Sequence, residues 1–325
     1  MKQTIQAAAA ILRGGVVAGA VLLGCGLFQP GARAAEISVT QWGQSMYGAP
    51  YAVALHDGLF KPCGDIDGII GSAGGGSTVR NMMASDLPYA EVAFPAAVAA
   101  IAHHLDVIIV NVGTDTPAGA SVVTTKTSAI HTLADLAGHK VAITTPRASS
   151  EMLLLMELQH KGIDPASVHR VASGGYVQGL SMLDSGEVDA AVLIEPLAIR
   201  RRDDYRTVVR AEDILPPMTM SVGITTRAFA SAHPDTLRCI IGQRRKAVER
   251  LYAAPAEAAT ILAEVYHMPP ELARVAIDNM VKAHMWSDGA IDTTELNRAA
   301  DGLKLIGELK GDIDWNTAVN SSFLN

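Results

Sequence analysis

The segment that best indicates the fold of this 325-residue chain is residues 66–85, IDGIIGSAGGGSTVRNMMAS. It opens with an apolar run, residues 66–70, that is typical of a buried strand. The run passes into a corner rich in Gly and Ser, residues 71–78, and then into a pattern typical of a helix. Because strands that turn through glycines into helices are characteristic of βαβ units, we expect an α/β protein.

Two further corners have a similar composition, at residues 144–150 (TTPRASS) and 173–176 (SGGY). Any one of the three could be an ordinary strand-to-helix connection. The first amides of a helix lack intrahelical partners and carry a partial positive charge, so each corner is also a prospective anion site. Ligands of open parallel sheets bind beyond the carboxyl ends of the strands. The three corners together therefore predict one anion-binding cleft.

Strand and helix patterns alternate along the chain. Strands are expected at residues 37–41, 66–70, 89–94, 107–112, 121–125, 140–143, 169–172, 188–194 and 220–225. Helices are expected at residues 50–56, 78–85, 96–103, 150–160, 236–252, 255–266, 271–281 and 293–309. The Pro-, Gly- and Thr-rich residues 114–119 form a candidate hinge, and the charged residues 200–204 are expected to be a solvated helix end.

Two parts of this pattern resemble each other, as in a weak internal repeat. The succession Gly-Gly, helix, Ser, strand, Pro occurs at residues 75–95 and again at residues 174–196. Such similarity is weak, but it suggests two lobes built on one plan, with a cleft between them.

Composition excludes several classes of protein. With 49% hydrophobic and 18% charged residues the chain is not disordered, and its length suits two domains with sizeable cores. The 26 Lys and Arg residues are outnumbered by 33 Asp and Glu, which gives a net charge of -7, and no dense basic run is present. Nucleic acid is therefore not an expected partner.

Signatures of catalysis and metal binding are missing from the sequence. It contains no P-loop, no G-x-S-x-G, no H-E-x-x-H and no C-x-x-C motif. His103 and His104 are adjacent, and adjacent helical residues point about 100° apart, so we interpret them as a surface pair at a helix end. We predict no catalytic residue, no metal site and no cofactor.

The N-terminal residues 1–35 are expected to be a targeting segment. Residues 14–28 are free of charge, follow basic residues and are too short for a comfortable membrane span, as in a secretory signal peptide. Residues 32–34 (Ala-Arg-Ala) suit a signal peptidase. Residues 22–25 (Leu-Leu-Gly-Cys) resemble a lipoprotein box, so Cys25 is the alternative end point, as a lipid anchor. Both interpretations export the protein, and no later segment resembles a membrane span.

Two cysteines, Cys63 and Cys239, follow this segment. An exported compartment permits a disulfide between them. Their wide separation in the sequence gives no indication of proximity, so we expect two unpaired thiols.

Several single residues are candidates for the cleft. Arg147 places a full positive charge among small hydroxyl residues, which suits bidentate binding of a carboxylate or sulfonate, unless it points to solvent or pairs across the surface. We expect Arg80 to form a structural salt bridge. Glu195 suits a helix start; if it faces the cleft instead, the ligand should carry a hydrogen-bond donor. Aromatic residues at strand ends and helix starts could stack on an organic group or belong to the core: Trp42, Tyr47, Tyr51, Phe94 and Tyr176.

Five collinear motifs carry a resemblance to a known family. They are GAPYAVA (48–54) with DGLF (57–60), LADLAGHKV (133–141), SSE (149–151), SGEVDAA (185–191) and Glu195-Pro196. Together they resemble the solute-binding proteins of ABC importers, in particular the group for aliphatic sulfonates, taurine, nitrate and pyrimidine precursors of thiamine.

That resemblance implies a type II periplasmic-binding fold, with two α/β lobes joined by two crossing strands. It places lobe one at residues 36–119 and 222–325, and lobe two at residues 120–221. It also implies an exported, periplasmic, monomeric receptor that delivers a small organic anion to a membrane permease and its ATPase. The ligand-contact positions it implies are Gln44, Ser45, Met46, Tyr47, Gly76, Ser77, Thr78, the segment Thr145 to Ser150, which contains Arg147 and Ser149, and the neighbourhood of Tyr176 and Glu195.

Two features leave alternatives open. Many relatives have small residues where this chain has Arg147, which favours a full anion but leaves sulfonate, carboxylate and pyrimidine ligands possible. A related subgroup consists of pyrimidine-precursor synthases with a cysteine-rich motif, and this chain has no such motif. A ligand sensor without transport is a third alternative, which a single chain does not distinguish.

Overall fold

The computed structural model describes residues 35–64 and 66–324 of the chain. The expected targeting segment, with Cys25 and both proposed processing signals, lies outside the described residues apart from Ala35. None of the helices in the described part combines the length and the apolar character needed to cross a membrane.

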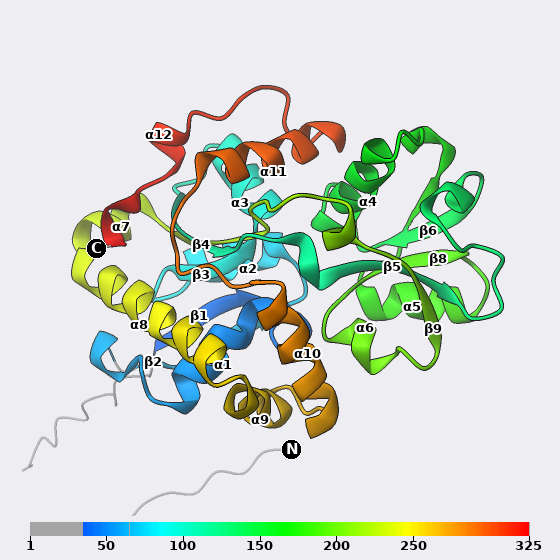
Figure 1. The fold of residues 1–325 in the computed structure, drawn as a ribbon. Helices are drawn as coiled ribbons and strands as arrows, with labels where there is room; N and C mark the ends of the chain where they lie inside the picture. The colour runs from blue at the N-terminus through cyan, green and yellow to red at the C-terminus, as the bar shows by residue number, and fades with distance from the viewer. Residues whose placement is uncertain (1–34, 65, 325) are drawn as a thin grey trace, which may run out of the picture. The chain divides into compact units, whose positions relative to one another are not determined.

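Five strands form the first sheet, in the order β2-β1-β3-β10-β4 (Figure 1). Their bounds are β1 (Ala35–Thr40), β2 (Ile66–Ser72), β3 (Tyr89–Ala93), β4 (Ile108–Thr114) and β10 (Ser221–Thr225). Strands β1, β2 and β3 run parallel, whereas β10 pairs antiparallel with both β3 and β4. The helices α1 (Ala49–His56), α2 (Gly75–Met83) and α3 (Phe94–Ala102) connect these strands. We call this sheet with its helices the first lobe.

The second sheet has the order β7-β6-β8-β5-β9. Its strands are β5 (Ala120–Thr125), β6 (Lys140–Ile143), β7 (His169–Ala172), β8 (Ala190–Ile194) and β9 (Tyr205–Arg210). The helices α4 (Ser149–His160), α5 (Tyr176–Asp184) and α6 (Leu197–Arg200) belong to it, and we call the whole the second lobe. The predicted α/β class is confirmed by these two mixed sheets.

The weak internal repeat in the sequence corresponds to a repeated topology. The succession β1-α1-β2-α2-β3 in the first lobe matches β6-α4-β7-α5-β8 in the second, and an antiparallel strand follows next in each sheet, β10 or β5.

The sequence did not predict β9. Its residues alternate only partly between buried and exposed, as befits an edge strand, and they follow directly on a charged turn.

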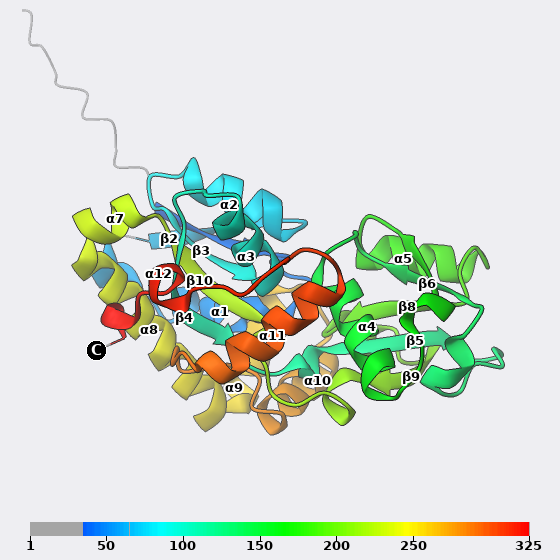
Figure 2. The ribbon, with the colours of Figure 1, turned by 90° about the horizontal axis from the view of Figure 1, so that it is seen from above.

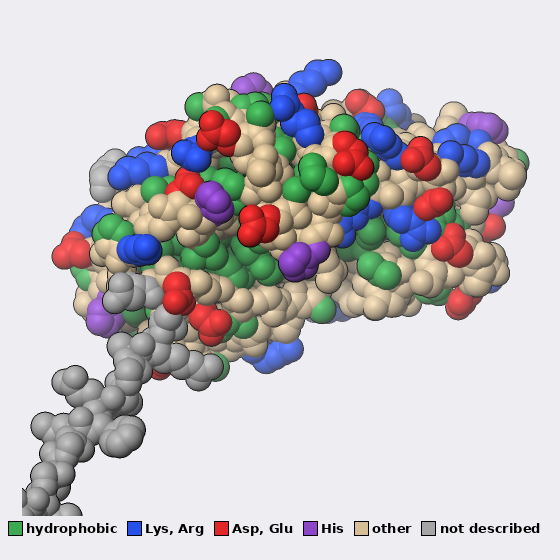
Figure 3. Space-filling model, turned by 90° about the horizontal axis from the view of Figure 1, so that it is seen from below, with side chains coloured by type: hydrophobic (Ala, Val, Ile, Leu, Met, Phe, Trp, Pro, Cys, Tyr) green, Lys and Arg blue, Asp and Glu red, His purple; other side chains and the backbone are tan. Residues whose placement is uncertain are grey.

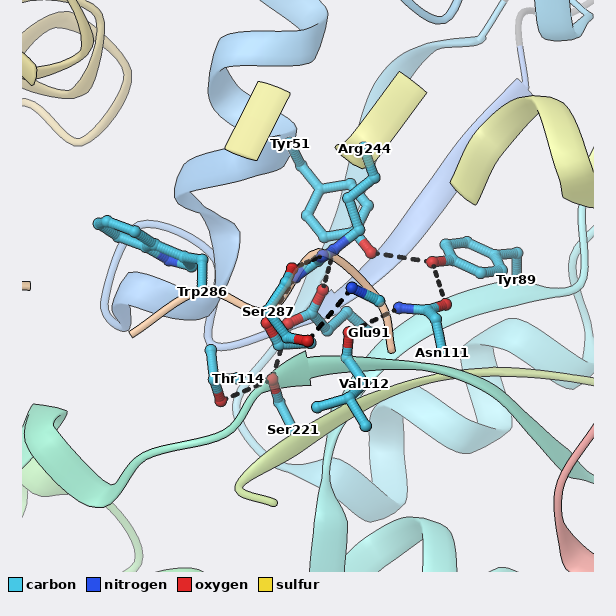
Figure 4. A network of polar contacts seen from close by, with 12 residues as sticks. Tyr51, Tyr89, Glu91, Asn111, Val112, Thr114, Ser221, Arg244, Trp286 and Ser287 are labelled. Atoms are coloured by element: carbon cyan, nitrogen blue, oxygen red, sulfur yellow. Dashed lines mark hydrogen bonds and ion pairs between the residues drawn. The ribbon is translucent and has the colours of Figure 1, made fainter. Parts of the chain in front are cut away.

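The chain crosses between the lobes twice. It leaves the first lobe after β4, through the 3-10 turn at Pro117–Gly119, and returns from β9 to β10. A buried polar network holds both crossings where they meet the first lobe (Figure 4). The Ser221 hydroxyl donates to Glu91 Oε1 at 2.7 Å and lies 2.9 Å from Thr114 Oγ1. Arg244 donates from Nε to Glu91 Oε2 at 3.0 Å and from Nη2 to the Gly113 carbonyl at 2.7 Å.

The C-terminal helices pack mainly on the first lobe, and two of them also contact the second lobe. They are α7 (Arg227–Ala232), α8 (Pro234–Ala253), α9 (Pro255–Val265), α10 (Pro270–Lys282), α11 (Thr293–Leu305) and α12 (Trp315–Ala318). Helix α10 contacts α6 of the second lobe. Helix α11 packs against α4 of the same lobe, as Figure 2 shows. Leu296 and Leu303 share a core cluster with Met152 and Leu153, so α11 connects the lobes in addition to the two crossings.

A disulfide joins Cys63 to Cys239, with 5.5 Å between their Cα atoms. The expectation of two unpaired thiols was therefore wrong. Cys239 lies on α8, which packs against α1, and this docking brings α8 beside the turn that carries Cys63. Sequence separation contains no information about such packing.

Acidic and basic side chains are interspersed on the face shown in Figure 3. Neither sign gathers there into a continuous patch. That face has no extended basic surface of the kind that nucleic-acid binding requires.

Candidate ligand-binding cleft

The three Gly-, Ser- and Thr-rich corners line one cavity of about 850 Å³. From the first corner Ala73 to Gly76 contribute, from the second Thr144 to Ser149, and from the third Gly174 and Tyr176. Each corner starts a helix of nine or more residues, α2, α4 or α5. The amides of their first turns have no intrahelical partners, so three partial positive charges from two lobes converge on this cavity.

In the first corner the side-chain hydroxyls are already engaged. Ser77 Oγ donates to the Gly74 carbonyl at 2.7 Å, and Thr78 Oγ1 lies 2.7 Å from Thr40 Oγ1 and 2.5 Å from Ser72 Oγ. Thr78 is fully buried, and neither Ser77 nor Thr78 lines the cavity. The first lobe therefore presents main-chain amides at this corner, among them those of Gly75 and Gly76.

In the second corner one of two adjacent hydroxyls is engaged. Ser150 Oγ accepts from the Thr144 amide at 3.0 Å and lies 2.8 Å from Thr144 Oγ1, so it is used within the corner and stays buried. The Ser149 hydroxyl is buried and has no partner among the described residues. Ser149 lines the cavity together with Thr145, and its hydroxyl is not used by any other described group.

Two tyrosines, one from each lobe, form the floor of the cleft. Tyr47 and Tyr176 line both the large cavity and a small adjoining pocket of about 20 Å³. Their hydroxyls form no hydrogen bond within the described part of the chain, and burial raises the pKa of each above its usual value. Both side chains therefore remain protonated at neutral pH and can donate.

The small pocket beneath this floor is lined by Ser45 and Glu195 among others. Glu195 is buried, and burial raises the pKa of its carboxyl group. It accepts from the Ile199 amide at 3.1 Å and lies 4.0 Å from Arg210 Nη1. Glu195 thus caps the helix start and lines the small pocket, whereas it does not line the large cavity.

Two arginines line the large cavity, and neither is buried in it. Arg147 has a positive φ of 64°, and its side chain is 63% exposed, with Nη1 3.8 Å from Glu308 Oε2. Among the described residues that line this cavity, Glu308 has the one carboxylate, and it lies beside Arg147. The expected salt bridge of Arg80 is not found with any described residue, and Arg80 lines the cavity from α2.

Gln44 and Phe94 are further candidate residues that lie away from both pockets. Gln44 is exposed and lines neither pocket. Phe94 is fully buried and packs against Trp315, with 6.1 Å between their ring centroids, on the side of α3 that faces the core.

An apolar wall completes the cavity, and the sequence analysis missed it. Val79 and Met83 on α2 and the small residues of α3 form it, with Leu105 beyond and His103 at its end. Met83 and Leu105 are each 41% exposed, which is high for large apolar side chains. Within α2 and α3 the wall residues recur every three or four positions, and this spacing was visible in the sequence. The same spacing is typical of a helix face packed in the core, so it did not indicate a cavity wall.

The fold and the cleft together define a class. Two α/β lobes connected by two crossings, with helix N-termini from both opening on one cavity, form the periplasmic-binding-protein fold. The sequence model of the NMT1/THI5-like family matches residues 45–258, a range that contains all three corners. The chain belongs to this family. No curated protein matches its sequence.

Solved structures agree on the fold. The periplasmic aliphatic sulphonate binding protein SsuA from Escherichia coli has a TM-score of 0.73 at 17% identity, over 89% of this chain and 92% of that one. The alkanesulfonate-binding protein SsuA from Xanthomonas axonopodis pv. citri, bound to MOPS, has the same score and identity, over 90% and 100%. At such identities the likeness shows the fold alone.

An enzyme shares the same architecture. The desulfurization enzyme DSZB has a TM-score of 0.63 at 14% identity, over 89% of this chain and 97% of that one. The fold therefore serves both binding and catalysis, and function has to be argued from the site.

Proposed function

We propose that this protein is the exported substrate-binding component of an ABC importer and that it binds a small organic anion in the cleft. The observation that carries the proposal is the convergence of the α2, α4 and α5 N-termini on one cavity. Family membership and the two sulfonate-binding structures support it. A sulfonate or carboxylate, aliphatic or aromatic, fits this arrangement.

Each part of the cleft has a distinct role in this proposal. The anionic group accepts from the first-turn amides and from the hydroxyls of Ser149, Tyr47 and Tyr176, which have no other partners among the described residues. Hydrogen bonds to a charged acceptor are stronger than those between neutral groups. The organic part of the ligand packs against the apolar wall of α2 and α3.

Ligand binding favours a closed state because the contacts come from both lobes. Tyr47 belongs to the first lobe, and Ser149 and Tyr176 belong to the second. A ligand shifts a conformational equilibrium only by its differential affinity for the two states. An anion that touches both lobes has that difference, and the closed surface is then what a permease recognises.

The experiment is calorimetry and native mass spectrometry on the exported protein. We expect a copurified or added sulfonate or carboxylate to bind in a one-to-one complex and to remain chemically unchanged. Failure of both classes to bind would contradict the proposal. Turnover of the bound compound would instead support a synthase-like or desulfurising enzyme on this fold, an alternative that the likeness to DSZB keeps in view. Tight binding of an uncharged pyrimidine precursor would favour a receptor for that class.

A further inference from the structure

The turn that carries Tyr47 is held by two buried aromatic donors from the C-terminal part of the chain. The Tyr266 hydroxyl donates to the Ser45 carbonyl at 2.9 Å. Trp286 donates from Nε1 to the next carbonyl, that of Met46, at 2.8 Å. Tyr266 and Trp286 are 4% and 2% exposed, so both bonds are shielded from water. The two consecutive carbonyls that lead into Tyr47 are therefore fixed from outside the turn.

Tyr266 follows α9 directly, and its own position is well defined. Its ring meets the ring of Trp42 edge to face, with 5.7 Å between the centroids. An added Cβ at Gly48 would lie 2.5 Å from the Tyr266 hydroxyl, so the backbone of the turn lies directly against that hydroxyl. The Tyr266 carbonyl accepts from Arg200 Nη2 of the second lobe at 2.6 Å. Contacts from both lobes thus hold this residue in place.

Tyr266 has no direct access to a ligand in the cleft. It lines neither the large cavity nor the small pocket, whereas Tyr47 lines both. The Tyr47 hydroxyl has no partner among the described residues, so the backbone of the turn has to set its direction. A donor contributes fully to binding only if it is held close to the required geometry. Any effect of Tyr266 on binding therefore passes through the turn to Tyr47.

We propose that Tyr266 is a positioning residue, whose hydroxyl holds the turn at Ser45 so that the Tyr47 hydroxyl points at the anionic group of the ligand. This inference rests on the proposed function of the same cleft. The variant Tyr266→Phe keeps the ring and its contact with Trp42 but loses the donor. The Tyr47 hydroxyl then remains present but is less firmly directed.

The test is a double-mutant cycle of Tyr266→Phe and Tyr47→Phe, measured by calorimetry with hexanesulfonate, benzenesulfonate, hexanoate and benzoate. Tyr47→Phe should weaken binding of those probes that bind by about tenfold, because a hydrogen bond to a charged acceptor is lost. Tyr266→Phe should weaken it by about fivefold in the native background and not at all in the Tyr47→Phe background. The effect vanishes there because the hydroxyl through which Tyr266 acts has already been removed.

Tyr205→Phe is the matched control. Tyr205 lies on β9, lines neither pocket and donates from its hydroxyl to Asp184. Its variant should lower thermal stability without changing the affinity for any probe. Should Tyr266→Phe not fold, Trp286→Phe removes the other donor to the turn, and it should weaken binding only where the Tyr47 hydroxyl is present.

A purely structural role for Tyr266 would weaken binding by the same factor in both backgrounds, and that result would overturn the inference. Unchanged affinity in Tyr266→Phe or in Tyr47→Phe would overturn it as well. In each of these cases the native protein still binds its probe, and the proposed function stands. If none of the four probes binds the native protein, the proposed function fails, and this inference fails with it.

Discussion

The two lobes follow one topology but contribute differently to the cleft. In the corner that begins α2, the hydroxyls of Ser77 and Thr78 bond within the first lobe, so amides and an apolar wall face the cavity. In the corner that begins α4, the Ser149 hydroxyl is unpartnered among the described residues and Arg147 adds a charge. The comparison teaches that a repeated backbone plan sets where the anion site lies, whereas individual side chains decide which lobe selects the ligand.

The lobes also differ in how they bury charge. The first lobe buries Glu91 and Arg244 as a pair inside a network of hydrogen bonds (Figure 4). The second lobe buries Glu157 on α4, 2% exposed, with Oε2 lacking a partner among the described residues. Burial raises the pKa of Glu157 to about 8. We therefore expect the two lobes to respond differently to mutation and to pH.

The largest effect is expected from breaking the buried pair. Arg244→Ala leaves Glu91 charged and unpaired, which should lower the free energy of unfolding by about 3–5 kcal/mol. Chemical denaturation measures this value. A loss below about 1 kcal/mol would show that the network at the crossings contributes little to stability.

The second lobe should respond to pH through Glu157. Its folded state holds the proton more tightly than the unfolded state, so stability should fall as the pH rises from about 4.5 to about 8. At about 1.4 kcal/mol per unit of pKa shift, the contribution is a few kcal/mol. Glu157→Gln should remove that dependence in thermal unfolding at several pH values. If the stability of Glu157→Gln falls with pH as steeply as that of the native protein, the prediction is wrong. Glu249→Gln, which changes an exposed residue of α8, is the control and should keep the pH dependence of the native protein.

Removal of the disulfide tests how much this covalent link within the first lobe stabilises the protein. Replacing both Cys63 and Cys239 with Ser should lower stability by about 2–4 kcal/mol, because the unfolded chain is no longer restrained. A reducing agent should lower the melting temperature of the native protein similarly and leave that of the double variant unchanged. Equal sensitivity of both proteins would exclude the bond.

Smaller effects are expected from substituting two adjacent serines of the second lobe, one on ligand affinity and the other on stability. Ser149→Ala should weaken binding of the identified anion by about 1 kcal/mol, close to fivefold, with little change in stability. Ser150→Ala removes a bond to Thr144 and should instead lower stability by a similar amount. Calorimetry and thermal unfolding on both variants give the comparison, and a reversed pattern would mean that Ser150 is the ligand donor.

The smallest effect is expected at Arg147. Because its side chain is mostly exposed, Arg147→Ala should weaken anion binding less than about fivefold, and the loss should shrink as salt is added. Titrations at low and high ionic strength test this. A loss that is large and independent of salt would place the guanidinium in direct, desolvated contact with the ligand.

Local patterns predicted most of the elements and the three corners because they depend on neighbours in sequence. The strand at 140–143 and the return strand at 220–225 were predicted and are observed as β6 and β10. Phe94 was expected to be a candidate for packing on the ligand, but it lies in the core against Trp315, a residue more than 200 positions away. An aromatic residue at a helix start looks the same in the sequence whichever side it faces.

The sequence by itself determined the α/β class, the repeated plan and the Gly- and Ser-rich helix starts, since these follow from periodicity and backbone chemistry over a few residues. Only the tertiary structure decided that Cys63 meets Cys239, that α11 reaches the second lobe, and that Glu308 lies beside Arg147 at the cavity. These contacts join residues far apart in the chain. They depend on how whole helices dock, and docking is set by the summed burial of many side chains rather than by any local motif.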